Sequence, residues 1–200
     1  MKITTEYVDV RTPDGGRIRA FVAAPQGAGK YPGILFYSDI FQLTGPMVRA
    51  VARLAGYGFV VAAPEIYRRT EEAGVVIPFD DAGRERGMNE AKVTAVAHFD
   101  YDCRAMLDYL HAHPAVAAGQ VGAAGFCIGG HLAFRAAMQP DVLATVCFYG
   151  TGIHNGSLGK DEDAGSLERA AEIRGEMLLV WGTLDPHIPA DGGGGGCDSI

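Results

Sequence analysis

Cys127 lies in the segment GFCIGG, with a glycine two residues before it and another two residues after it. A short apolar run precedes this segment at residues 121–124, and apolar residues follow at helical spacing from 131 to 138. Strand, sharp turn and helix in this order are typical of a nucleophile elbow, where a strained central residue needs neighbours that can pass close to adjoining chain. The pattern therefore presents Cys127 as a candidate nucleophile.

Cys127 would stand at the N-terminus of the helix that follows it. Unpaired N–H groups and the helix dipole favour negative charge there, so the sequence predicts that the pKa of this thiol falls below its usual value of about 8.5. Cys103 and Cys147 lie in apolar surroundings typical of buried small hydrophobes. The sequence contains no cysteine or histidine cluster at zinc spacing, so we expect no metal site.

Asp185 follows the buried strand expected at residues 176–181, in the turn GTLDP. Open α/β sheets place their sites at the carboxyl ends of strands, where an acid can orient an imidazole and stabilise its charged form. An aspartate before a proline also initiates turns, so a purely structural Asx turn is the alternative. The elbow elsewhere in the chain favours the catalytic interpretation.

Asp39 comes directly after another buried strand, expected at residues 33–37. The next amide, that of Ile40, lies where hydrolases recruit one donor of the oxyanion hole, and the amide of Ile128 would supply the other. A structural acid that bonds loop amides at the strand end is the alternative for Asp39.

These residues require a scaffold in which strands and helices alternate. Residues 4–10 and 17–23 alternate in period two around the turn PDGG, which predicts a β-hairpin. Later apolar runs predict buried strands, and helical spacing predicts helices between them. The alternation indicates a mostly parallel sheet covered by helices on both faces. The expected strands lie at 33–37, 59–63, 121–124, 142–149 and 176–181, and the expected helices at 46–54, 90–111, 131–138 and 166–174.

The 200 residues have 48% hydrophobic content and a formal net charge of −7. We expect one sizeable core, in a single domain over residues 1–190. The acidic balance argues against a nucleic-acid partner, and the first residues lack the apolar stretch of a signal peptide or membrane span. Free thiols fit a reducing compartment. We therefore expect a cytoplasmic protein, monomeric or dimeric, without a nucleic-acid or membrane partner.

Four motifs together resemble the dienelactone hydrolase family of α/β-hydrolases: SDIFQLTG, APEIYRR, GFCIGG and WGTLDPHIP, each placed after an expected strand. The resemblance runs from Lys2 to Pro189. It implies a cysteine–histidine–aspartate triad and hydrolysis of an enol-lactone, dienelactone to maleylacetate, in the breakdown of chlorinated aromatics. By matching motif, Cys127 takes the place of the nucleophile and Asp185 that of the acid.

The resemblance also implies roles for two charged side chains. The family has glutamate where this chain has Asp39, and that carboxylate takes the proton of the thiol when substrate arrives. Aspartate is shorter by one methylene. Arg84 falls where the family places an arginine that binds the substrate carboxylate, a task that suits a bidentate guanidinium. The alternative for Arg84 is one charge in the solvated run at residues 80–86.

The family's histidine follows the acid after another helix and strand, whereas this sequence ends at Ile200. Residues 191–200 form a glycine-rich tail, so we expect the domain to lack a final strand and helix. His187, two residues from Asp185, and His131, one helical turn beyond Cys127, are the substitute candidates. A turn histidine without a role and a packed or capping helix residue are the respective alternatives.

The sequence thus predicts an α/β-hydrolase fold and cysteine-dependent hydrolysis of an ester or enol-lactone through an acyl-enzyme, without a cofactor. The expected partner is a small-molecule ester or lactone. Two alternatives stay open: a thiol hydrolase of the same fold that acts on another ester or thioester, and a non-catalytic, redox-responsive module with an oxidisable Cys127.

Overall fold

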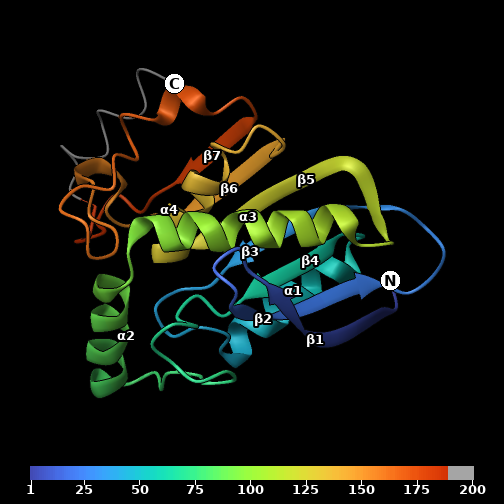
Figure 1. Ribbon diagram of the computed structural model, residues 1–200, viewed down its shortest axis with the longest axis horizontal. Helices are drawn as coiled ribbons and strands as arrows, with labels where there is room; N and C mark the ends of the chain where they lie inside the picture. The colour runs from blue at the N-terminus through green and yellow to red at the C-terminus, as the bar shows by residue number, and fades with distance from the viewer. Residues whose placement is uncertain (189–200) are drawn as a thin grey trace.

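Seven strands form one sheet in the computed structural model, which describes residues 1–188. The strand order is β1-β2-β4-β3-β5-β6-β7, so the chain crosses over twice near the centre of the sheet (Figure 1). The predicted tail at residues 191–200 and the predicted domain end at 190 lie outside the described residues. The strands are β1 (Ile3–Arg11), β2 (Arg17–Pro25), β3 (Tyr31–Tyr37), β4 (Val60–Pro64), β5 (Val116–Phe126), β6 (Ala144–Phe148) and β7 (Glu176–Val180).

The predicted hairpin and the mostly parallel sheet are both confirmed. β1 pairs antiparallel with β2 in a continuous register from Ile3 opposite Pro25 to Arg11 opposite Arg17. β2 pairs antiparallel with β4, and the remaining neighbours pair in parallel. Parallel pairing brings the carboxyl ends of β3, β5, β6 and β7 to one edge of the sheet, where their following loops meet.

Helices cover both faces of the sheet (Figure 1). On one face, α1 (Gly45–Gly56) packs Val51 and Ala55 against apolar side chains of β2, β3 and β4. On the other face, α3 (Val96–Ala112) and α4 (Ile128–Ala136) enclose the larger core. Successive residues of β4 point to opposite faces, so Val60 joins the larger core and Val61 the smaller one.

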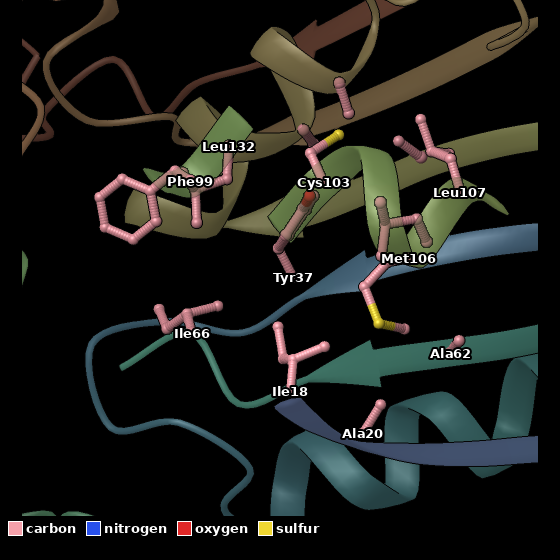
Figure 2. Close-up of a cluster of buried hydrophobic side chains, with 14 of the residues drawn as sticks. Ile18, Ala20, Tyr37, Ala62, Ile66, Phe99, Cys103, Met106, Leu107 and Leu132 are labelled. Carbon is pink, nitrogen blue, oxygen red and sulfur yellow. The ribbon is translucent and has the colours of Figure 1, made fainter. Parts of the chain in front are cut away.

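The larger core fills the space between α3 and the sheet. Figure 2 shows Ile18 and Ala20 of β2 and Ala62 of β4 on one side of this layer, with Met106 and Leu107 of α3 among the facing side chains. These side chains are buried almost completely, so burial of apolar surface is the main force that holds α3 on the sheet. The core fixes the strands whose ends carry the site.

The prediction of one continuous helix at residues 90–111 is wrong in its first part. The chain forms two helices, α2 (Asp81–Val93) and α3, because Thr94 and Ala95 have extended backbone with ψ of 130° and 143°. α2 begins where Asp80 accepts a hydrogen bond from the Gly83 amide at 2.7 Å. In Figure 1, α2 stands to one side of the sheet, next to the beginning of α3.

The prediction of a helix at residues 166–174 is also wrong. This segment forms only turns and a short 3-10 helix, Ala170–Glu172. Its first residue, Ser166, is fully buried and bonds side chains of α4, and Gly165 has a positive φ of 60°. Tertiary contacts at Ser166 therefore override the helix propensity of the residues that follow.

Candidate active site

Cys127 forms the elbow predicted between β5 and α4. Its backbone has φ 58° and ψ −125°, a region that residues with a side chain rarely adopt. The Cys127 amide donates to the carbonyl of Phe148 at 3.1 Å, and its carbonyl accepts from Gly130 at 2.9 Å. These bonds hold the strained residue at the N-terminus of α4, with β6 directly beside it.

Two glycines let the elbow pack this tightly. A Cβ at Gly125 would lie 2.0 Å from the carbonyl oxygen of Gly129, and a Cβ at Gly129 would lie 2.2 Å from that of Ser38. Both distances are far below van der Waals contact, and both neighbours are backbone atoms. Any larger side chain at these positions must displace the elbow.

We expect Gly129→Ala to lower the free energy of unfolding by about 2–3 kcal/mol, because the added methyl overpacks a backbone contact. Gly56→Ala is the matched control, since no atom lies within 4 Å of a Cβ at this position at the end of α1. Urea unfolding followed by circular dichroism measures both variants. Equal unfolding midpoints for the two variants would contradict the proposed tightness of the elbow.

A cavity of about 800 Å³ opens in front of Cys127. It lies between α2, the elbow and the loop that follows β6. The lining residues are Ile40, Asp81, Arg84, Glu85, Met88, Ala91, Lys92, Cys127, Ile128, Thr151, Gly152, His154, Asn155, Ser157, Leu158, Gly159 and His187. A volume of this size is ordinary for a site that binds a small molecule.

The expected fall in the pKa of Cys127 is not found. Burial raises the pKa of this thiol, and the charges of Asp39 and Asp185 raise it further. Hydrogen bonds from the Ile128 amide and the Thr151 side chain lower it, but they do not outweigh burial. The helix N-terminus alone therefore does not make a thiolate in the free protein, and a base must take the proton.

Asp39 lies half-buried beside Cys127. Its carboxylate accepts a hydrogen bond from the Phe41 amide at 2.9 Å, as the structural alternative expects. Burial nevertheless raises its pKa, and its charge acts on the thiol. A carboxylate of raised pKa is a stronger base than an exposed one.

Asp185 also lies close enough for its charge to act on Cys127. It forms the Asx turn of the structural alternative, because its carboxylate accepts from the His187 amide at 2.9 Å. The two interpretations are compatible, since the turn holds the acid in the loop after β7 while its charge still acts on the thiol.

The two residues expected to supply oxyanion donors line the same cavity as the nucleophile. Ile128 and Ile40 both line the cavity, and their residues are almost fully buried. The Ile128 amide points at the sulfur of Cys127, where it lowers the pKa of the thiol. Within residues 1–188, no acceptor takes the amide hydrogen of Ile40. The Ile40 amide can therefore donate to an oxygen that develops charge in the cavity.

Arg84 lies in the cavity wall, on α2. Its guanidinium is 3.8 Å from Asp81, and both side chains are largely exposed, so this ion pair is weak. Lys92 lies eight residues later on the same face, two helical turns away, with Met88 between them. The α2 wall therefore carries two cations, Arg84 and Lys92, beside two carboxylates, Asp81 and Glu85.

The three histidines nearest the elbow have different surroundings. His187 lines the cavity beside Asp185, and His154 lines it as well. His131 is completely buried, and both of its ring nitrogens bond protein atoms: Nδ1 lies 2.9 Å from the Thr151 carbonyl and Nε2 lies 2.7 Å from the Ser166 hydroxyl. His131 does not line the cavity, and both of its ring nitrogens are already bonded. It therefore offers no free nitrogen to a substrate.

The sequence interpretation missed His154. It lies in a short 3-10 helix between Gly152 and Gly156, which have positive φ values of 76° and 67°. The available signal was its position soon after a buried strand, at the edge of the sheet where sites form. A histidine in a glycine-rich loop gives no other indication of its direction.

The buried His131 predicts a pH-dependent stability. Burial lowers the pKa of this imidazole to about 4, whereas in the unfolded chain it titrates near 6.5. Between these two pH values the unfolded chain binds more protons than the folded protein. The contribution of His131 to the free energy of unfolding is therefore fully present above pH 6.5 and is lost as the pH drops toward 4. We expect a loss of about 3 kcal/mol from this group.

Urea unfolding between pH 4 and pH 8 measures this loss. His131→Asn cannot titrate, so its stability should depend less steeply on pH below 6.5 and run parallel to the original protein above pH 7. Identical slopes below pH 6.5 would contradict the buried neutral imidazole.

Comparison with known proteins identifies the family and the fold. A sequence profile of the dienelactone hydrolase family matches residues 18–193. The chain belongs to the dienelactone hydrolase family. A Saccharomyces cerevisiae member, provisionally named a carboxymethylenebutenolidase, is 38% identical over 200 residues, covering 96% of this chain and 72% of the relative. The carboxymethylenebutenolidase of Pseudomonas putida is 27% identical over 186 residues, covering 93% of this chain and 74% of the relative.

Solved structures of dienelactone hydrolase type share the architecture. A dienelactone hydrolase-like promiscuous phosphotriesterase from metagenomic libraries is 26% identical with a TM-score of 0.73, covering 97% of this chain and 74% of that chain. A Klebsiella pneumoniae protein, provisionally described as a dienelactone hydrolase, has a TM-score of 0.76 at 22% identity and covers 97% of this chain and 78% of that chain. The predicted α/β-hydrolase fold is thereby confirmed.

Membership of the dienelactone hydrolase family makes this protein a carboxymethylenebutenolidase-like ester or lactone hydrolase. Within residues 1–188, no helix combines the length and apolar character needed to cross a membrane. In the same part of the chain, no three histidine, cysteine, aspartate or glutamate side chains gather as they would around a metal ion.

Proposed function

We propose that this protein hydrolyses a small carboxylic ester or enol-lactone that carries an anionic group, with Cys127 as the nucleophile. The single observation that carries the proposal is the placement of Cys127: a strained elbow at the N-terminus of α4, open to a cavity of about 800 Å³. The family resemblance supports a lactone of the dienelactone type as the substrate class.

The first half-reaction begins with proton transfer. Asp39 takes the thiol proton of Cys127, and the sulfur attacks the carbonyl carbon of the substrate. The carbonyl oxygen becomes an anion that the Ile128 and Ile40 amides stabilise. Collapse of this intermediate breaks the carbon–oxygen bond of the ester, and the leaving oxygen recovers a proton from Asp39. In an enol-lactone the leaving group is an enol, which becomes the ketone.

The second half-reaction hydrolyses the thioester. Water attacks the acyl carbon, a base takes its proton, and the sulfur leaves as the thiolate and is then protonated. Within residues 1–188, His187 and His154 are the imidazoles in the cavity wall. Asp185 accepts the backbone amide of His187 at 2.9 Å, which keeps the acid and this imidazole in one turn.

Arg84 provides a test of the substrate class. We expect Arg84→Gln to raise the KM for an ester that carries a carboxylate by about 10- to 100-fold, because a charge-assisted hydrogen bond is lost. The KM for a neutral ester of similar size should change little. Steady-state kinetics on the matched pair of esters measures both values.

Arg86→Gln is the matched control on the same helix. Arg86 bonds Glu71 and does not line the cavity, so its loss should not distinguish the two esters. Equal effects of Arg84→Gln on the anionic and the neutral ester would contradict an anionic substrate. Faster hydrolysis of a thioester than of either oxygen ester would favour the related thiol hydrolase.

A further inference from the structure

A tight turn just after β3 sets the direction of the Ile40 amide. The Gln42 amide donates to the Asp39 carbonyl at 3.2 Å and closes this turn. The Asp39 carbonyl and the Ile40 amide belong to one planar, trans peptide group, so they point in opposite directions. Whatever fixes the turn therefore also fixes the direction in which the Ile40 amide can donate.

Gln42 holds this turn through its side chain. Its backbone has a positive φ of 64°, which is costly for a residue other than glycine, and such strain persists where the surroundings enforce it. The side chain is fully buried and bonded at both ends. Nε2 donates to the Val75 carbonyl at 3.0 Å, and Oε1 accepts from the Tyr67 amide at 3.3 Å. The turn is thus bonded to the segment that follows β4.

Tyr67 lies in the segment APEIYRR, to which the proposed function gives no role. Its side chain is fully buried, and its hydroxyl donates to the Gly87 carbonyl at 3.2 Å. Gly87 lies in the middle of α2, between Arg84 and Met88 of the cavity wall. Tyr67 therefore joins the turn after β3 to the helix that forms one side of the cavity.

α2 in turn packs against the residue that carries the amide. A Cβ at Gly87 would lie 2.5 Å from the Ile40 carbonyl oxygen and 3.1 Å from the Ile40 Cβ, so the close approach requires glycine. These contacts close a ring that runs from Gln42 to Tyr67, from Tyr67 to Gly87, and from Gly87 back to Ile40 in the turn. The side chains of Gln42, Tyr67 and Ile40 are buried, so water does not compete for the hydrogen bonds of the ring.

We propose that Gln42 and Tyr67 are positioning residues for ester hydrolysis, which hold the Ile40 amide in the direction in which it donates to the oxyanion. The proposal rests on the oxyanion role of Ile40 in the proposed function. Tyr67 also bonds α2 at Gly87, so the wall that carries Arg84 and the oxyanion donor keep a fixed separation. A residue that only filled space could be replaced by an apolar side chain of similar shape without loss of rate.

Tyr67→Phe tests the proposal, because it removes the hydroxyl and keeps the aromatic ring. Acylation by a neutral chromogenic ester, measured in a single turnover of the full chain, should be about tenfold slower at saturation, since a displaced donor loses part of its usual contribution. The ester concentration at half-saturation should change little. Tyr109→Phe is the matched control, since Tyr109 packs on His113 at the end of α3 and does not line the cavity.

Alkylation of Cys127 by iodoacetamide separates positioning from general damage. In this reaction the sulfur displaces iodide from a methylene carbon, so no oxyanion forms and the Ile40 amide has no part. Tyr67→Phe should therefore be alkylated at the original rate, which peptide mapping measures for Cys127 alone. An original rate of acylation in Tyr67→Phe, or an equal fall in acylation and alkylation, would overturn the proposal.

Gln42→Leu breaks the same ring at another bond and should slow acylation by about 10- to 100-fold. Because both variants act through one amide, the double variant should be no slower than Gln42→Leu alone. Multiplied single effects in the double variant would show independent losses and overturn the ring. If Gln42→Leu fails to fold, Tyr67→Phe alone decides.

The amide resonance of Ile40, observed by NMR in protein with isotope-labelled isoleucine, requires no ester. It should move in Tyr67→Phe, while the resonance of Ile128 stays in place. A moved Ile40 resonance in a chain that hydrolyses no ester would overturn the proposed function and leave the positioning intact. Hydrolysis through Cys127 with an unmoved Ile40 resonance in Tyr67→Phe would overturn the inference alone.

Discussion

Cys127→Ala is expected to reduce ester hydrolysis by about 10⁴-fold or more, because the thiol that forms the acyl intermediate is lost. Cys127 is the cysteine that lines the cavity within residues 1–188, while Cys103 and Cys147 are buried in the core. Burial raises the pKa of each of these two thiols to about 12, so neither ionises near neutral pH. The initial rate with a chromogenic ester measures the effect.

Cys147→Ala is the matched control. It removes a buried thiol from β6, near the elbow but outside the cavity, and should keep most of the activity. Unfolding midpoints of both variants separate a lost nucleophile from a lost fold. Activity in Cys127→Ala above about 1% of the original would show that another group attacks the ester.

Asp39→Asn is expected to slow acylation by about 10²- to 10⁴-fold, the usual contribution of a general base. The amide keeps the size of the side chain but has little affinity for a proton. Asp39→Glu should retain or improve the rate, since the longer carboxylate reaches further toward the sulfur. Single-turnover measurements with a small ester isolate this step.

A structural Asp39 makes a different prediction. The carboxylate accepts the Phe41 amide, and the amide oxygen of asparagine can accept the same hydrogen bond. If Asp39 served only that turn, Asp39→Asn would acylate at the original rate and Asp39→Glu would be the worse variant. The order of the two variants therefore separates a base from a turn residue.

The sequence was sufficient where local rules decide the structure. The elbow depends on GFCIGG and its neighbours, and its geometry is as predicted, with Cys127 at φ 58°. The hairpin at β1 and β2 follows from period-two alternation and a turn of Gly, Pro and Asp residues. Asp39 and Asp185 follow strands that the apolar runs identify, so their common edge could be expected from a parallel sheet.

Long-range contacts explain the failures. The break between α2 and α3 depends on Asp161, which accepts the Val96 amide at 2.6 Å, and on Lys160, whose amide bonds the Thr94 carbonyl. No pattern within residues 90–111 contains that information. The raised pKa of Cys127 has a similar origin. Burial raises it together with Asp39 and Asp185, two carboxylates that are far from Cys127 in the sequence.

A stopped-flow burst experiment with a chromogenic ester, followed by peptide mapping of the quenched protein, measures the nucleophile directly. We predict a burst of about one product per active chain and an acyl group on Cys127, formed before any steady turnover. Loss of Asp39 should slow the burst without moving the acyl group. Product release without an acylated Cys127, or an acyl group on another residue, would contradict Cys127 as the nucleophile.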